Sequence, residues 1–232
     1  MDFNYYCNQN YTDKGDLLPS GNRYSNFYEN WFSKIKNSAT NICEIGIDSG
    51  GSLKSYYDYF KNTQIFGLDI NDKSLYNNDR IKTFILDQSK SQDLDSFFNY
   101  CKSNSIQFDF ILDDGSHDVE HQQLTFGKLF DLIKPQGFYI IEDLGSSYFT
   151  LGTNLYGYTK TQTKINNNTI KFLNQRPFSS LWISEENLIE INNSVDSVVI
   201  FDTYNKDLPY STNFTCENNY PIRSITSVIK KK

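Results

Sequence analysis

Short apolar runs alternate with amphipathic stretches along much of this 232-residue chain. Their β-branched and aromatic content predicts five buried strands, which cover Asn41–Ile47, Gln64–Ile70, Ile81–Asp87, Phe108–Asp114 and Gly137–Asp143. Near-continuous apolar strands separated by helices are typical of a parallel sheet that is covered on both faces. The pattern therefore predicts an α/β fold.

Apolar residues at helical spacing fill the stretches around these strands. Tyr24, Phe27, Tyr28, Trp31 and Ile35 form one stripe, which predicts a helix before the first strand. The same spacing predicts helices after the first, third and fourth strands, with apolar faces made of Leu53, Tyr56, Tyr57 and Phe60; of Leu94, Phe97, Phe98 and Cys101; and of Phe126, Leu129, Phe130 and Ile133. The KPQG stretch at residues 134–137 is expected to end the last helix.

The pattern becomes less regular after the fifth strand. Gly145–Phe178 predicts a loop and one amphipathic helix. Glu186–Asn192 and Asp196–Tyr204 are expected to be two late strands that form a hairpin. The run Lys230–Lys232 is interpreted as a solvated tail, because short terminal charge runs are usually disordered.

Charge and cysteine content exclude several classes of protein. The formal net charge is −6, and the sequence contains no basic stripe that would bind nucleic acid. No apolar run approaches the ~20 residues that span a bilayer, and no leader pattern opens the chain. The four cysteines lack the CxxC spacing of a metal or disulfide framework: Cys7, Cys43, Cys101 and Cys216. We therefore expect a cytoplasmic protein that binds neither nucleic acid nor membrane.

Acidic side chains gather where the predicted strands end. They are Asp69, Asp87, Asp113, Asp114, Glu142 and Asp143. Open parallel sheets bind their ligands at the carboxyl ends of the strands. These residues are therefore the first candidates for a site.

The stretch EIGIDSGGSL, residues 44–53, predicts a nucleotide pocket. Gly46 and Gly50 permit a tight turn before a helix, although Asp48 stands where a dinucleotide fingerprint has its middle glycine. Asp69 follows about twenty residues later, where an acid can bond ribose hydroxyls, and Asp87 ends the next strand. A tight turn without a ligand is the alternative. The combination favours an adenosine ligand, either a nicotinamide cofactor or S-adenosylmethionine (SAM).

A second candidate site lies in DDGSHDVEH, which holds both histidines of the chain. Asp114 comes from the fourth strand, and Glu142 and Asp143 come from its neighbour, so three carboxylates meet in a hard, oxygen-rich site that suits Mg²⁺. His117 lies within reach and is the candidate general base. His121, one helical turn on, is expected to pack against or orient its neighbour. A zinc site with both histidines, or a merely hydrogen-bonded His117, remains open.

Several stretches together resemble a known family. EIGIDSGGSL, DQS, DDGSHDVEH…KPQGFYIIEDL and the leading YTDKGD…YSNFYE are similar to metal-dependent sugar O-methyltransferases of macrolide tailoring, which are class I SAM-dependent enzymes. The resemblance runs from about Tyr11 to Tyr148. It implies a Rossmann-like fold with a mostly parallel seven-stranded sheet and a late antiparallel hairpin.

The resemblance also implies roles for individual residues. SAM would be bound by Glu44, Gly46, Gly50, Ser52, Asp69, Asp87, Gln88 and Asp113, with Tyr24 and Tyr28 closing over it. Mg²⁺ would be bound by Asp114, Glu142 and Asp143. His117 would take the proton of the acceptor hydroxyl, which we expect on a nucleotide sugar, glycan or glycoside.

The chain departs from the family in length and in residues 151–186, which cannot be aligned. We expect one domain, with a helical lead (1–40), a cofactor-binding core (41–144), an acceptor lid (145–186) and C-terminal strands and tail (187–232). Analogy with the family suggests a homo-oligomer. A catechol-type O-methyltransferase, an NAD-dependent nucleotide-sugar enzyme and a non-catalytic partner subunit are the alternatives.

Overall fold

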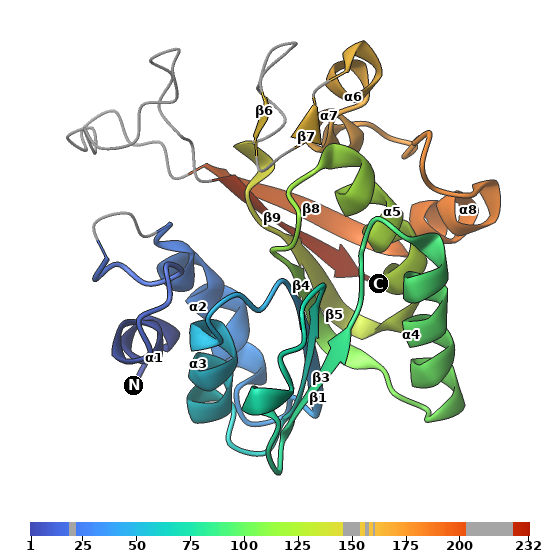
Figure 1. Cartoon of the computed structure of the whole chain (residues 1–232). Coiled ribbons are helices and arrows are strands. Elements are labelled where there is room, and N and C mark those ends of the chain that lie inside the picture. Colours follow the sequence, from blue (N-terminus) through green and yellow to red (C-terminus); the bar gives the residue numbers. More distant parts are fainter. Residues whose placement is uncertain (19–21, 146–153, 156–157, 160, 203–224) are drawn as a thin grey trace.

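The central element of the fold is one seven-stranded sheet in the order β3-β2-β1-β4-β5-β9-β8 (Figure 1). The computed structural model describes residues 1–18, 22–145, 154–155, 158–159, 161–202 and 225–232. The strands of the sheet are β1 (Asn41–Ile45), β2 (Gln64–Asp69), β3 (Ile81–Ile85), β4 (Phe108–Asp113), β5 (Ile133–Ile141), β8 (Val195–Asp202) and β9 (Ile225–Lys231). The first five pair in parallel, and β9 runs antiparallel to both β5 and β8. The predicted fold class is confirmed.

Helices cover both faces of this sheet (Figure 1). One face carries α1 (Phe3–Gln9), α2 (Tyr24–Ile35) and α3 (Gly51–Tyr59). The other carries α4 (Ser91–Ser103), α5 (Val119–Leu129), α7 (Thr169–Asn174) and α8 (Glu185–Ser194). Smaller elements are α6 (Gln162–Asn166), the β6–β7 pair (Asn154–Leu155 and Tyr158–Thr159) and the 3₁₀ turns Ser74–Tyr76 and Phe130–Leu132.

The second half of strand β5, residues 138–141, shows why a buried stretch of strand lacks polar alternation. Phe138 and Ile140 face the core under α1–α3, whereas Tyr139 and Ile141 face the core under α4, α5 and α7. Successive strand side chains point to opposite faces, so a strand covered on both sides must be apolar throughout. The same constraint leaves only the ends of the strands for polar chemistry.

Aromatic rings fill the core between α2 and the sheet. Phe32 of α2 is fully buried, stacks on Phe110 of β4 with ring centroids 4.6 Å apart, and meets Phe3 of α1 edge-to-face at 5.0 Å. Such pairs add about 0.5–1.5 kcal/mol each to ordinary burial. This packing binds the N-terminal helices to the sheet, and it uses the high aromatic content of the chain.

The prediction of a strand at Glu186–Asn192 is wrong, because this segment belongs to helix α8. Ser184 caps the helix by accepting a hydrogen bond from the Asn187 backbone N–H at 3.3 Å, and two glutamates fill the first turn. Ile191 is buried against the core. The N-terminal cap and the burial of one face of the segment therefore favour a helix over a strand.

The interpretation of Lys230–Lys232 as a solvated tail is also wrong. Lys230 and Lys231 belong to β9, which lies between β5 and β8. The ammonium of Lys231 lies 3.7 Å from a carboxylate oxygen of Asp131. The partner of the predicted strand at residues 196–204 is thus β9, and the antiparallel hairpin of the fold forms from segments that were not paired in the sequence analysis.

Two further boundaries differ from the prediction. The helix expected to extend to Ile133 ends at Leu129, and β5 begins at Ile133 and includes the KPQG stretch. Helix α1 was not predicted; Asp2 caps it by accepting a hydrogen bond from the Tyr5 backbone N–H at 2.9 Å. The described residues between β5 and Phe178 form two short helices, α6 and α7, where one was predicted.

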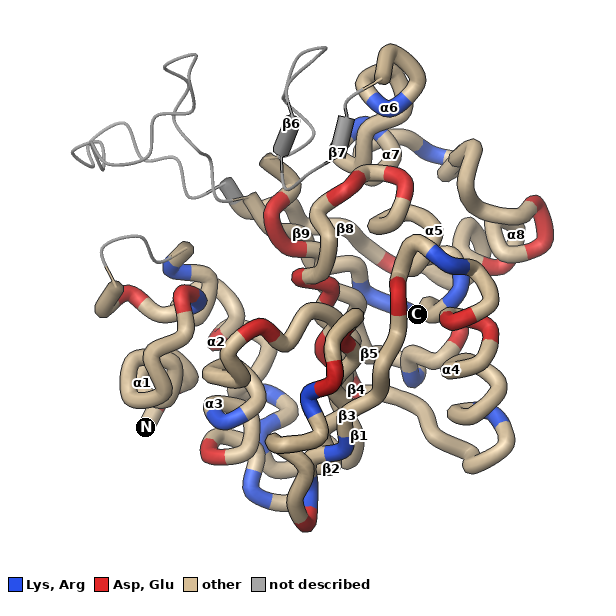
Figure 2. Tube along the Cα trace, in the orientation of Figure 1, with Lys and Arg blue, Asp and Glu red and all other residues tan. Residues whose placement is uncertain are grey.

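The charged residues and the thiols can be placed where the structure describes them. Lys and Arg are interspersed with Asp and Glu over the described elements (Figure 2). Cys7, Cys43 and Cys101 are buried free thiols, and Cys216 lies outside the described residues. Within the described ranges, each helix is too short or too polar to cross a bilayer.

We expect Phe32→Ala to lower the free energy of unfolding by about 3–5 kcal/mol, because it removes a ring that contacts α1, α3 and β4. Urea unfolding followed by circular dichroism measures the change. Leu75→Ala, at a side chain that is 75% exposed, is the control and should stay within about 0.5 kcal/mol. Equal stability of Phe32→Ala and the control would contradict the role assigned to this ring.

Candidate active site

The glycine-rich turn brings the end of β1 against the end of β4. Gly46 has φ +85°, and a Cβ atom there would lie 2.1 Å from the backbone oxygen of Asp114. Gly50 has φ +75°, and a Cβ atom there would meet the ring of Tyr76 at 2.5 Å. Both positions need glycine for conformation and for space. Helix α3 starts at the next residue, so its free N–H groups lie at this turn.

A cavity of about 210 Å³ opens between this turn and residues 11–18 of the lead. Gly46, Asp48 and Ser52 line one side, and Thr12 and Lys14 line the other. The carboxylate of Glu44 is buried beneath it and accepts a hydrogen bond from the Ser52 hydroxyl. Burial, opposed by the charge of Lys14, raises the pKa of Glu44 to about 7. Gly46 and Ser52 thus line one cavity, and Glu44 is linked to it through the Ser52 hydroxyl.

Asp69 and Asp87 lie at the ends of β2 and β3. Asp69 accepts backbone hydrogen bonds from Ile47 at 2.9 Å and from Asn71 at 2.8 Å, so it shapes the turn beside the cavity. Asp87 accepts from the backbone and the hydroxyl of Ser89, which lowers its pKa. Both side chains are half-buried and retain acceptor capacity for a ligand.

Gln88 and Asp113 lie together in a buried network. The Gln88 amide donates to Asp113 at 3.1 and 3.3 Å, and its oxygen accepts from the Ser116 backbone N–H. A Cβ atom at Gly115 would lie 2.1 Å from that amide oxygen. Burial raises the pKa of Asp113 to about 7. The structure therefore places both residues beneath the loop that follows β4, where they position its backbone.

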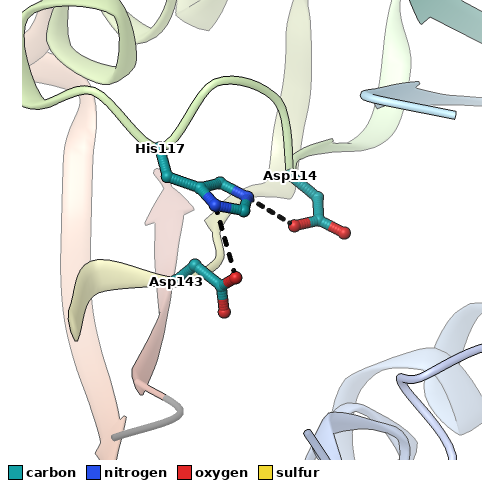
Figure 3. A group of neighbouring side chains, drawn as sticks. All are labelled: Asp114, His117 and Asp143. Carbon is teal, nitrogen blue, oxygen red and sulfur yellow. Dashed lines mark hydrogen bonds and ion pairs between the residues drawn. The ribbon is translucent and has the colours of Figure 1, made fainter. Parts of the chain in front are cut away.

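Asp114, His117 and Asp143 form the compact polar group of the site (Figure 3). The His117 ring lies between the two carboxylates, with Nε2 3.0 Å from Asp114 and Nδ1 3.4 Å from Asp143. One potential ligand atom from each residue lies within 4.8 Å of the others. His117 and Asp143 have φ +58° and +52°, a left-handed conformation that is uncommon outside glycine. Backbone strain of this kind concentrates at functional sites.

The two aspartates control the protonation of His117. Burial alone disfavours its charged form, but the hydrogen bond to Asp114 and the charge of Asp143 raise the pKa to about 9. The pKa of Asp114 is lowered, because Lys14 and His117 outweigh the effect of burial. The two carboxylates therefore favour the protonated form of His117 over the neutral form that a general base needs.

Tyrosines of α2 contact the carboxylates of Glu142 and Asp143. The Tyr28 hydroxyl donates to Glu142 at 2.8 Å, and the Tyr24 hydroxyl donates to Asp143 at 3.0 Å. Both rings are fully buried, and burial raises the pKa of both phenols. Both tyrosines thus contact carboxylates that are predicted metal ligands, and their contact with the cofactor remains a prediction. Glu142 is fully buried, and burial raises its pKa.

Lys14 is the residue of the site that the sequence analysis missed. Its ammonium contacts Asp114, lies 2.8 Å from Glu142, and lies 3.8 Å from Glu44. Burial lowers its affinity for a proton, but the three carboxylates reverse this and raise the pKa of Lys14 above its usual value. The YTDKGD stretch around Lys14 is part of the family resemblance, but no spacing in it distinguishes a buried lysine from an exposed one.

His121 lies behind the loop. Its Nδ1 is 2.8 Å from the hydroxyl of Ser116, the residue before His117. Burial lowers its pKa. The geometry agrees with the expected orienting role, and the histidines do not share a cluster of metal ligands among the described residues.

The described part of the expected acceptor lid adjoins the same loop. Lys164 of α6 lies 2.8 Å from both carboxylate oxygens of Asp118, the residue after His117 and the cap of α5. Phe172 and Phe178 are buried in the core over α5. Residues 146–153, 156–157 and 160 lie outside the described residues. The division into lead, core, lid and tail remains a prediction.

Comparison with known proteins confirms the resemblance that the motifs predicted. No protein-family model matches the chain. It is 36% identical over 132 residues to the 8-demethyl-8-(2-methoxy-alpha-L-rhamnosyl)-tetracenomycin-C 3'-O-methyltransferase of Streptomyces olivaceus. That alignment covers 54% of this chain and 33% of the relative. It is also 35% identical over 129 residues to the mycinamicin VI 2''-O-methyltransferase of Micromonospora griseorubida. That alignment covers 53% of this chain and 31% of the relative.

The solved structures show the fold. The MycE methyltransferase from the mycinamycin pathway, in complex with Mg, SAH and mycinamycin VI, aligns with 99% of this chain and 54% of its own at a TM-score of 0.69 and 23% identity. An O-methyltransferase from Bacillus cereus in complex with SAH aligns over 98% of this chain and 90% of its own chain, with a TM-score of 0.53 and 16% identity. The chain therefore has the class I methyltransferase fold. It matches only about a third of the length of the curated relatives.

We expect Gly46→Ala to destabilise the protein by about 2 kcal/mol or more, because a methyl group at φ +85° would overlap the backbone of Asp114. Thermal and urea unfolding measure this loss. Ser49→Ala, in the exposed part of the same turn, is the control and should change stability by less than about 0.5 kcal/mol. A Gly46→Ala variant as stable as the control would show that the strand ends are not in close contact.

Proposed function

We propose that this protein is a SAM- and Mg²⁺-dependent O-methyltransferase that acts on a hydroxyl of a sugar in a glycoside, glycan or nucleotide sugar. One observation carries the proposal: the cavity at the glycine-rich turn is bordered by Asp114, which is also a member of the Asp114–His117–Asp143 group. A methyl donor in the cavity would thus lie beside the group that could bind and deprotonate an acceptor.

The donor set fits a hard divalent cation. Asp114 and Asp143 offer carboxylate oxygens within 4.8 Å of each other, and such oxygens are the ligands that Mg²⁺ prefers. Both would hold the ion. Glu142, the third predicted ligand, lies outside the Asp114–His117–Asp143 group, and its two carboxylate oxygens accept hydrogen bonds from Tyr28 and Lys14. A bound Mg²⁺ polarises a coordinated hydroxyl and lowers its pKa.

His117 is the candidate base for that hydroxyl. The same two carboxylates that raise its pKa to about 9 are the proposed metal ligands, so a cation bound to them would oppose that shift. The neutral ring then has a nitrogen lone pair available for the hydroxyl proton. The remaining task of the protein is to align hydroxyl, methyl and sulfur for in-line displacement.

The nature of the relatives supports a sugar acceptor over a phenol. Their names specify methylation at the 3' position of a rhamnosyl tetracenomycin and at the 2'' position of mycinamicin VI. A homo-oligomeric assembly remains a prediction.

We expect S-adenosylhomocysteine to bind one-to-one with a Kd on the order of 1–100 μM, because the cavity would take its amino-acid part and Asp69 would bond its ribose. Isothermal titration calorimetry measures this directly, without knowledge of the acceptor. NADH is the comparison ligand. No binding of S-adenosylhomocysteine with or without Mg²⁺ would refute the methyltransferase proposal, and binding of NADH instead would favour the nucleotide-sugar alternative.

We expect His117→Ala to lower kcat by about 10²–10⁴-fold, with the Kd for S-adenosylhomocysteine nearly unchanged, because it removes a proton acceptor and not a cofactor contact. Methyl transfer from labelled SAM to a panel of glycosides, with Mg²⁺ present and with EDTA, supplies the rates.

The matched control is His121→Ala, which removes the other histidine of the chain and should lower kcat by less than about tenfold, because His121 contacts the loop through Ser116. A His117→Ala enzyme that keeps wild-type kcat would remove the base assignment.

A further inference from the structure

Lys14 joins the carboxyl ends of three strands. Its ammonium pairs with Glu44 of β1, and with Asp114 and Glu142, which follow β4 and β5. The side chain is 1% exposed, although lysine is rarely buried unless it is paired. These carboxylates belong to both halves of the site: Glu44 lies under the cofactor cavity, and the other two lie at the metal side.

The backbone around Lys14 forms a wall of the cofactor cavity. Residues 11–18 lie between α1 and α2, and Tyr11, Thr12 and Leu18 line the cavity with Lys14. The Lys14 carbonyl accepts a hydrogen bond from the Ser25 backbone N–H at 2.9 Å, at the start of α2. The wall is thus attached to α2 through its backbone and to the sheet through one ammonium group.

We propose that Lys14 is a positioning residue that holds residues 11–18 against the sheet and balances the carboxylates which the cofactor pocket and the metal site share. This inference rests on the proposed methyltransferase function. It assigns Lys14 no contact with the reacting atoms.

The charges explain why one ammonium matters. Glu44, Asp114, Glu142 and Asp143 are four carboxyl groups in one largely buried region, and Lys14 contacts three of them. Removing one partner of a buried ion pair leaves charge without compensation, which is more costly than replacing the whole pair. Without Lys14, the wall loses the ion pairs that join it to the strand ends, and the buried carboxyl groups lose their compensating charge.

A divalent cation can replace part of this compensation, since it would bind Asp114 in the same group. The proposal therefore makes a specific claim about coupling. In the wild type, the ammonium already balances the carboxylates, so cofactor binding should depend little on Mg²⁺. Without Lys14, cofactor binding should become dependent on Mg²⁺.

The test is calorimetric titration of the full chain with S-adenosylhomocysteine, at zero and millimolar Mg²⁺. We expect the wild-type Kd to change less than about threefold with Mg²⁺. Lys14→Met, which keeps length and removes charge, should weaken binding by roughly 10- to 100-fold without Mg²⁺ and regain about fivefold or more with it. Lys54→Met, at an exposed lysine of α3, is the control and should match the wild type in both conditions.

A second variant keeps the test decisive if Lys14→Met does not fold. Lys14→Ala leaves space for a propylammonium ion, which should restore S-adenosylhomocysteine binding, whereas propanol at the same concentration should not. Restoration by both additives would mean that only volume matters and would overturn the proposal.

The outcomes separate the two proposals. Wild-type protein that does not bind S-adenosylhomocysteine removes the methyltransferase function, and this inference with it. If the wild type binds S-adenosylhomocysteine, two results would overturn only the role of Lys14. In one, Lys14→Met binds as tightly as the wild type. In the other, Lys14→Met loses the same affinity with and without Mg²⁺.

Discussion

The site depends on the accumulation of negative charge at the carboxyl ends of β1, β4 and β5. Carboxylates from these three strand ends converge on one ammonium, that of Lys14. Buried charge of one sign is costly, and the fold compensates for it with a buried cation and with two tyrosine hydroxyls. The same charge suits this edge of the sheet to the divalent cation of the proposed function.

This compensation explains the position of the N-terminal segment. α1 and α2 are attached to the sheet by aromatic packing around Phe32, and α2 then carries Tyr24 and Tyr28 to Asp143 and Glu142. Apolar burial supplies the energy, and the polar tips of buried tyrosines supply the partners that the carboxylates need. The lead is therefore part of the site as well as of the core.

Close backbone approach is the second constraint. Gly46 permits the ends of β1 and β4 to touch, and Gly115 permits the Gln88 amide to reach the loop that carries His117. His117 and Asp143 adopt left-handed backbone conformations in the same region. The geometry of the Asp114–His117–Asp143 group is thus fixed by its supporting network more than by the three residues themselves.

The sequence by itself determined the five parallel strands, most of the helices, the glycine-rich turn and the candidate residues at the strand ends. These features depend on local periodicity and on the rule that parallel strands present their carboxyl ends at one edge. Other features depend on residues up to 198 positions apart in the chain. They are the role of Lys14, the contacts of the tyrosines, and the pairing of β9 between β5 and β8. Only the tertiary structure decided them, because burial and ion pairing are properties of the folded core, and lysine, tyrosine and a short lysine run have the same local pattern whether exposed or buried.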